Sequence, residues 1–271
     1  MKLSEIYQIA DTIAPVRLSH EYCEQYGAYD NSGILVDTGE EIKGITFSLD
    51  LSLGAIAMAK QTGANLIITH HPAIYGKIGN VRNADPLGKK LVECIKNGIS
   101  VLCMHLNLDV AEDGIDDNLM QAVRLSSGDG SQTPVVTQHV LSEKAGYGKA
   151  YAVKPCTLRT LQTGLERELC TKRILVYGDL EKKVERVASF CGSGVDENAI
   201  NFAIKNTGGK ADVIISSDFK HHLISLALEA ETAVMIITHY ASENYGFKKY
   251  YEKIRRQVNV PCTYYTDETM L

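Results

Sequence analysis

Short runs of β-branched and apolar residues alternate along the chain with longer segments whose apolar positions recur every three to four residues. The first pattern is typical of buried strands, and the second is typical of amphipathic helices. Strands are expected at residues 44–49, 65–69, 100–104, 173–176, 184–190, 212–216, 233–238 and 261–264. Helices are expected at residues 1–15, 51–62, 86–97, 116–124, 158–170, 197–206, 219–230 and 243–254. This alternation predicts an α/β fold with mixed sheets flanked by helices.

Two segments of the chain have similar patterns. Residues 57–72, AMAKQTGANLIITHHP, and residues 202–219, FAIKNTGGKADVIISSDF, each run from a helix through a Thr-Gly turn into an apolar strand. The glycine suits a helix C-cap in the left-handed region. Two interpretations stay open, because many α/β units share this order: a common connection, or two similar α/β domains.

The composition is that of an ordinary globular protein. Its 271 residues are 45% hydrophobic and 23% charged, which is enough apolar material for a sizeable core. The net charge of −5 offers no basic field, so nucleic-acid binding is not expected. No run approaches the length of a membrane span, and the N-terminal segment lacks the apolar stretch of a signal peptide. The seven cysteines are an odd number without a CxxC pair, and most lie in apolar segments, which favours reduced thiols in the cytoplasm.

Candidate metal ligands directly follow two of the expected strands. His70 and His71 come after the apolar run at residues 65–69, at the strand end where ligands bind in open α/β sheets. His105 and Asp109 follow the next expected strand in the same way. Each element alone has another explanation, because histidine pairs are often structural and aspartates often cap helices or turns.

A third element is His239-Tyr-Ala-Ser-Glu243, after the expected strand at residues 233–238. The four-residue spacing puts His239 and Glu243 on one face if the helix starts early. Alternatively, Ser242 caps the helix and leaves Glu243 as a favourable acid in the first turn.

The three elements together predict one metal site. If their strands lie parallel in one sheet, their C-terminal ends meet at one edge. The resulting imidazoles and carboxylates, without a thiolate, suit Zn²⁺, Mn²⁺ or Fe²⁺. They exceed the four ligands of one tetrahedral ion, so we predict two divalent metal ions per chain that activate water.

Convergence of the three elements requires the segment near His239 to return to the domain that holds His70. We therefore assign residues 1–125 plus 232–271 to a first α/β domain that carries the metal ligands, and residues 126–231 to a second. The polar stretch SSGDGSQTP, which begins at residue 126, has the composition of a loop between them.

Two further features lie near these elements. The turn CGSG at residues 191–194 precedes an expected helix, where an anion binds readily, but it lacks the nucleotide-binding glycine fingerprints. A simple tight turn is the alternative. His221 and His222 follow Asp218 at the start of another expected helix, and their alternative is a surface pair. No cofactor-binding residues other than metal ligands are assigned.

The chain resembles the Nif-three-like family, also known as GTP cyclohydrolase I type-two homologues. The matching pieces are THHPAIYG (69–76), MHLNLDVAEDGIDDNLM (104–120), CGSG (191–194), DVIISSDFKHH (212–222) and THYASENYG (238–246). The resemblance implies one dinuclear metal centre, with the ligands His70, His71, Asp109, His239 and Glu243. It also implies that His105 is a sixth ligand or a neighbour that supports the ligands.

The resemblance further implies that the His221–His222 segment lies near the metal cavity, with His222 as a proton donor or substrate contact. The family's glycine-rich turn has one more glycine than CGSG has here. The assembly implied is a toroidal homohexamer of two-domain α/β subunits in the Nif-three-like fold, with metal sites facing an inner cavity. The inserted middle domain of longer members does not fit in this chain length.

Two classes of function remain open. The first is a metal-dependent hydrolase that acts on a nucleotide or related small molecule through a metal-bound hydroxide, with His105 or His222 moving protons. The second is a non-enzymatic metal-binding protein with an interaction, regulatory or metal-chaperone role. Open coordination positions that hold water would distinguish the hydrolase, because structural metal sites are saturated by the protein.

Overall fold

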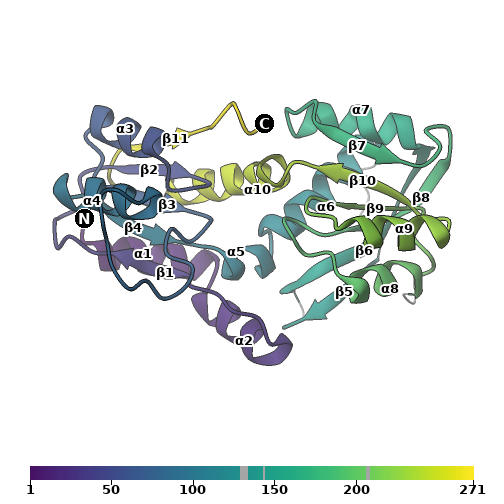
Figure 1. Cartoon of the computed structure of the whole chain (residues 1–271), viewed down its shortest axis with the longest axis horizontal. Coiled ribbons are helices and arrows are strands. Elements are labelled where there is room, and N and C mark those ends of the chain that lie inside the picture. The colour runs from purple at the N-terminus through teal and green to yellow at the C-terminus, as the bar shows by residue number, and fades with distance from the viewer. Residues whose placement is uncertain (129–133, 143, 206–207) are drawn as a thin grey trace. The chain divides into compact units, whose positions relative to one another are not determined.

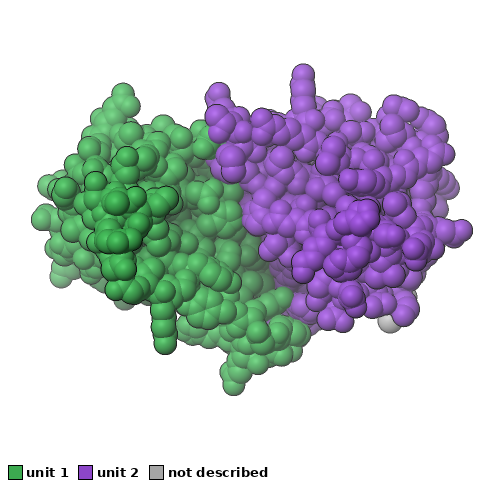
Figure 2. Space-filling view, in the orientation of Figure 1, with its two compact units in different colours: residues 1–111, 247–267 green, residues 112–246, 268–271 purple. Residues whose placement is uncertain are grey.

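The computed structural model describes residues 1–128, 134–142, 144–205 and 208–271. Over these ranges the chain forms two compact units, coloured separately in Figure 2. Unit 1 comprises Met1–Ala111 and Phe247–Asp267, and unit 2 comprises Glu112–Gly246 and Glu268–Leu271. Each unit has a mixed sheet flanked by helices (Figure 1), which confirms the α/β fold predicted from the alternating pattern.

The sheet of unit 1 has the strand order β1-β4-β3-β2-β11. Its strands are β1 (Gly33–Val36), β2 (Ile45–Ser48), β3 (Leu66–Thr69), β4 (Ser100–Cys103) and β11 (Cys262–Tyr265). All run parallel to their neighbours except β1, which pairs antiparallel with β4 at one edge. Every residue of β2, β3 and β4 is buried, as expected for parallel strands that are covered on both faces.

Helices cover this sheet through apolar contacts. Those of unit 1 are α1 (Leu3–Ile13), α2 (Val16–Tyr26), α3 (Leu53–Thr62), α4 (Pro86–Lys96) and α5 (Leu106–Val110). Ile56 of α3 and Leu91 of α4 share a buried apolar cluster with Ile67 of β3. Phe47 of β2 contacts the later part of α10 (His239–Ile254), with its ring centroid 6.2 Å from that of Phe247. Within the described ranges, no helix is both long enough and apolar enough to cross a membrane.

The sheet of unit 2 has the strand order β5-β6-β8-β9-β10-β7. Its strands are β5 (Val135–Val140), β6 (Gly146–Thr157), β7 (Ile174–Tyr177), β8 (Lys183–Ser189), β9 (Val213–Ser216) and β10 (Ala233–Ile237). The central strands β8, β9 and β10 are parallel, and the outer pairings are antiparallel. Its helices are α6 (Ile115–Ser126), α7 (Leu158–Glu168), α8 (Glu197–Lys205) and α9 (His221–Glu229).

The division into units differs from the expected domain boundaries. Helix α6 packs against α7 and β6, so it belongs to unit 2 and the first division falls after Ala111. Strand β10 pairs with β9 and β7 in the sheet of unit 2. The expectation that one sheet holds all three ligand-bearing strands is therefore wrong, because β3 and β4 lie in one sheet and β10 in the other. Residues 129–133, in the expected boundary loop, lie outside the described residues.

The two similar sequence segments have equivalent places in the two units. In each, a helix leads into a buried strand that runs parallel to both neighbours: α3 into β3, and α8 into β9. Gly63 ends α3 with a φ of 71° and donates its N–H to Ala59, which confirms the predicted left-handed C-cap. In the second segment, residues 206–207 lie outside the described residues.

Candidate metal centre

Strands β3 and β4 deliver three histidines to one end of the unit 1 sheet. The strands are parallel neighbours in register, so His70 and His71 leave β3 close to where His105 follows β4. The backbone N–H groups of His70 and His71 both donate to the Leu49 carbonyl at the end of β2, at 3.1 and 2.9 Å. One ring nitrogen from each of the three histidines lies within 4.8 Å of the other two. This trio could hold a metal ion.

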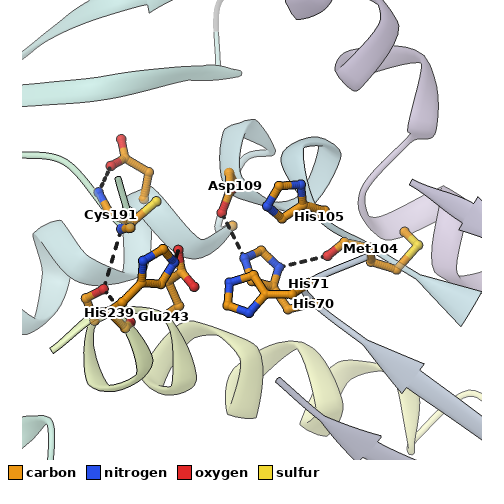
Figure 3. Close-up of polar contacts among 12 residues, drawn as sticks. His70, His71, Met104, His105, Asp109, Cys191, His239 and Glu243 are labelled. Atoms are coloured by element: carbon orange, nitrogen blue, oxygen red, sulfur yellow. Dashed lines mark hydrogen bonds and ion pairs between the residues drawn. The ribbon is translucent and has the colours of Figure 1, made fainter. Parts of the chain in front are cut away.

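The His70 ring is fully buried, and its protonation follows from its neighbours (Figure 3). Its Nδ1 lies 2.8 Å from the backbone carbonyl of Met104. A carbonyl only accepts, so Nδ1 carries a proton, and in the neutral imidazole Nε2 presents a lone pair. That Nε2 lies 3.3 Å from Oδ1 of Asp109, which is also buried on α5. In this neutral form a nitrogen lone pair and a carboxylate oxygen face each other in a buried place, where a cation between them would be stabilising.

His71 and His105 are held in the same way by aspartates. His71 Nδ1 lies 2.8 Å from Asp50 Oδ1, and His105 Nδ1 lies 2.7 Å from Asp30 Oδ1. Burial opposes the charged form of His105, but the hydrogen bond to Asp30 and the Asp109 charge raise its pKa. Burial likewise opposes the Asp30 charge, but His105 and two serine hydroxyls hold the pKa of that carboxyl well below its usual range.

Unit 2 repeats this arrangement at the start of α10. His239 Nδ1 lies 2.8 Å from Asp218 Oδ2, and His239 Nε2 lies 3.0 Å from Glu243 Oε1. Asp218 follows β9, so it stands at the place in unit 2 that the His70–His71 pair has in unit 1. In the neutral imidazole, a proton on Nδ1 again leaves a lone pair on Nε2, which faces a buried carboxylate. His239 and Glu243 thus add one imidazole and one carboxylate to the candidate donors.

The structure decides between the two interpretations of the third element. Helix α10 begins at His239, so His239 and Glu243 share a face, as the spacing predicts for an early start. Thr238 accepts a hydrogen bond from the Ala241 N–H, so it takes the capping role. The alternative in which Ser242 caps the helix is wrong, because Ser242 lies inside the first turn and donates to the His239 carbonyl.

The CGSG turn packs directly on this pair. Gly192 has a φ of +55°, and a Cβ there would collide with Glu243 Oε1 and lie 3.2 Å from His239 Nε2. The Gly192 carbonyl accepts from the Ser216 hydroxyl at 3.3 Å. The Gly192 position therefore needs a glycine both for its backbone and for the room it leaves to the Glu243 carboxylate. No special role was predicted for this turn beyond anion binding or a tight turn.

His221 and His222 are exposed at the start of α9 in unit 2. His222 lines a pocket with Asp196, Lys220 and Leu223. Neither histidine belongs to the candidate ligand groups among the described residues. The role of His222 as a proton donor or substrate contact stays a prediction.

Sequence reasoning missed the three aspartates that hold the histidines. Asp50 follows the end of β2 and Asp218 follows the end of β9. The signal that identified His70, a polar residue just after an apolar strand, also marks these two. Asp30 precedes β1 in an irregular segment, and no pattern in the sequence distinguishes it.

The chain is similar in sequence to the proteins of a known family. It matches the model of the Duf34/NIF3 (NGG1p interacting factor 3) family over residues 1–269. The chain belongs to the NIF3 family. The predicted resemblance to the Nif-three-like family is confirmed.

Several relatives from bacteria and archaea match the chain over most of their own length. The GTP cyclohydrolase 1 type 2 homolog of Clostridium perfringens is 30% identical over 261 residues, which cover 96% of this chain and 93% of the relative. Among solved structures, reduced HcgD from Methanocaldococcus jannaschii has a TM-score of 0.77 and 26% identity, over 97% of each chain. A Bacillus cereus protein related to NIF3 has a TM-score of 0.77 at 20% identity, over 98% of this chain and 97% of its own, and supports the fold alone.

Proposed function

We propose that this NIF3-family chain binds two divalent metal ions and is a metal-dependent hydrolase. The proposed ligands are His70, His71, Asp109, His239 and Glu243. One repeated observation carries the proposal: in both units, a histidine donates from Nδ1 to an acceptor and turns Nε2 toward a carboxylate oxygen. A neutral imidazole nitrogen and a carboxylate oxygen are donor types that a divalent cation binds.

We further propose that the two halves of the ligand set serve one dinuclear centre. Helix α10 is continuous from His239 to Ile254, and Glu243 lies one turn before Phe247 on the same face. The Phe247 ring centroid is 5.9 Å from that of His70. Four residues of helix rise about 6 Å, which is the spacing of Glu243 and Phe247 along α10. In the proposed centre Glu243 would be one of the five ligands and would supply negative charge to it.

We assign His105 as a sixth ligand. Its Nδ1 is bound to Asp30, as the Nδ1 of His71 is bound to Asp50. Its other ring nitrogen is the atom that remains to join those of His70 and His71 within 4.8 Å.

Bound divalent ions would supply Lewis-acid activation of water and of an electrophilic carbon or phosphorus. The chain's own residues orient that chemistry: buried Asp109 and Glu243 set the negative charge of the site, and the aspartates fix the imidazoles. The curated relatives are called GTP cyclohydrolase 1 type 2 homologs, so a nucleotide or a related small molecule is the substrate class we propose.

The test combines metal analysis with turnover. Metal-loaded protein should contain two ions per chain by elemental analysis, and one ion or none would refute the dinuclear centre. A screen of nucleotides and phosphoesters with that protein should show hydrolysis that is lost in His70→Ala. Hydrolysis that persists in His70→Ala would assign the activity to another site or to a contaminant.

The second candidate function is a non-enzymatic metal-binding protein that acts through partners. The family description, NGG1p interacting factor 3, favours an interaction role for at least some members. Two ions without turnover of any screened compound, and without bound water open to exchange, would support this candidate over the hydrolase. In either case we propose a cytoplasmic protein, because the seven cysteines are an odd number, most lie in apolar segments, and they are free thiols in the structure.

A further inference from the structure

Three aspartates from separate segments make the same contact with three of the candidate ligands. Asp50 lies 2.8 Å from His71 and Asp218 lies 2.8 Å from His239, in each case at Nδ1. Asp30 contacts His105 Nδ1 at 2.7 Å. None of these aspartates is close in sequence to the histidine it holds, so local chain geometry does not explain the pairing. The recurrence of one contact in both units indicates a common purpose.

We propose that Asp50 and Asp218 are positioning residues, which fix His71 and His239 with Nε2 as the metal-binding nitrogen. The inference rests on the proposed metal centre and adds to it two residues that bind no metal themselves. A carboxylate can only accept, so each aspartate keeps the proton on Nδ1 and prevents rotation of the ring. Its negative charge also makes Nε2 a stronger donor to a cation.

The Asp50 and Asp218 carboxylates are too exposed to contribute much to the stability of the fold. The Asp50 and Asp218 side chains are 49% and 56% exposed, while their histidines are 24% and 33% exposed. An exposed hydrogen-bonded pair of this kind contributes little to stability in water. A role in orienting the ring therefore explains the geometry better than a role in holding the fold together.

Asp30 differs from the other two and is left out of the test. Its side chain is 1% exposed, and it also accepts hydrogen bonds from the hydroxyls of Ser19 and Ser32 at 2.6 Å. Its loss would disturb the buried segment before β1 as well as His105. His70 is held by the Met104 carbonyl, which no substitution removes.

The experiment measures Zn²⁺ affinity of the full-length chain, stripped of metal, by competition with a chromophoric chelator. The variants are Asp50→Ala, Asp218→Ala and the corresponding Asn substitutions. Asp179→Ala is the matched control, since Asp179 is exposed, follows β7 closely and its carboxylate accepts only from the nearby Glu181 N–H among the hydrogen bonds described. Thermal unfolding of each metal-free variant reports any structural role.

We expect both Ala variants to weaken Zn²⁺ binding by roughly 10- to 100-fold, the loss typical of such supporting contacts. The Asn variants should lose less, because the amide oxygen still accepts from Nδ1 although the charge is gone. The visible spectrum of the Co²⁺-loaded Ala variants should shift with the altered coordination, while the metal-free unfolding temperatures match those of Asp179→Ala.

Two outcomes would overturn the inference. Ala variants that bind Zn²⁺ as tightly as the unsubstituted chain would show that the aspartates do not support the ligands, and the proposed metal centre would stand. An unsubstituted chain that binds no Zn²⁺, Mn²⁺ or Fe²⁺ would refute the metal centre and the inference with it.

Discussion

At the scale of single residues, Glu243 is the most informative of the proposed metal ligands. Its side chain is only 4% exposed, and it meets His239 in the first turn of α10. The sequence suggested an exposed first-turn acid as the alternative, but a surface acid would not be sequestered beside an imidazole. A carboxylate this buried, with Oε1 3.0 Å from an imidazole nitrogen, is the kind of oxygen donor that a divalent cation binds.

Replacing Glu243 with Gln should separate metal binding from folding. The amide keeps the size of the side chain but removes the charge, so metal affinity should fall by roughly 10- to 100-fold. The metal-free protein should change in free energy of unfolding by about 1 kcal/mol or less, the net contribution of one hydrogen bond. Chelator competition and denaturant unfolding measure the two quantities. Unchanged metal affinity would mean that Glu243 is not a ligand.

Replacing Gly192 with Ala should weaken the site by steric means. The new Cβ would collide with Glu243 Oε1, which can move away because it ends a flexible side chain. Metal affinity should therefore fall, by a factor that chelator competition measures. The left-handed backbone adds a stability cost of about 1–2 kcal/mol for any residue with a Cβ.

Gly128→Ala is the control for this prediction. Gly128 has a φ of +77° with nothing within 4 Å of its added Cβ, so it shares the backbone cost and lacks the collision. Equal metal affinity in the two variants would show that Gly192 matters only for the backbone. A loss confined to Gly192→Ala would support its role in leaving room for the carboxylate.

The ligands themselves could be found from the sequence because they are histidines and carboxylates placed just after apolar strands. Asp50 and Asp218 share that placement, but aspartate after a strand is common in turns, and only a three-dimensional contact distinguishes these two. Asp30 does not follow an apolar strand, so no sequence pattern marked it. The orientation of each imidazole depends on partners 20 or more residues away in the chain, and no local pattern encodes that distance.

At the scale of secondary-structure elements, Asp116 ties three of them together in unit 2. Its two carboxylate oxygens accept the N–H groups of Cys191, at 3.1 Å, and Gly148, at 2.9 Å, so α6 is bound to the CGSG turn and to β6. Burial raises the pKa of Asp116 to about 7, although the Lys149 charge and both hydrogen bonds act in the other direction.

This shift predicts a pH dependence of stability. A raised acid pKa favours the protonated form in the folded state, so the stability it contributes is present below about pH 4 and is lost as the pH rises to about 7. The unfolding free energy of the natural chain minus that of Asp116→Asn should therefore fall between these values and stay level above them. Denaturant unfolding at a series of pH values measures the difference. A difference that rises with pH would mean that the two N–H donors outweigh burial.

The elements that the sequence predicted well are those with unbroken apolar patterns. Strands β3, β4 and β10 begin at or within one residue of their expected starts, because short buried runs leave little choice. Strand β6 was missed: it contains Gly146, Gly148, Lys149 and Pro155, and its register shifts before Cys156. Those residues disfavour a strand locally, and pairing with β5 and β8 overrides that preference.

At the scale of the whole molecule, the sequence predicted two α/β units but not which strand joins which sheet. Strand β10 is apolar and is followed by ligands, as β3 is, and nothing in its residues shows that it pairs with β9. Helix α10 begins in unit 2 and its later residues belong to unit 1. The sequence predicted this helix to begin only at residue 243, after the end of the strand at residues 233–238, and did not show that one helix contributes residues to both units.

The last prediction concerns assembly: the chain should form a homohexamer. The family resemblance implies this, and unit 1 exposes Ile78, Val81 and Ile95 at 41%, 43% and 57% along one groove. Apolar clusters exposed in this way mark interfaces between proteins. Sedimentation at micromolar concentration should give the hexamer mass, and Ile95→Lys should shift the chain to smaller species, because a charge buried at an apolar interface is costly.

The outcomes of these measurements distinguish the existence of the hexamer from the role of this groove as one of its interfaces. A monomer for the unsubstituted chain would refute the hexamer, since closed symmetric assemblies normally persist at that concentration. A hexamer that survives Ile95→Lys would keep the assembly and remove this groove from its interfaces. Metal content should be the same in Ile95→Lys as in the unsubstituted chain, because Ile95 lies on α4, away from the strand ends that present the histidines. A parallel loss of metal would indicate that assembly and the metal centre depend on each other.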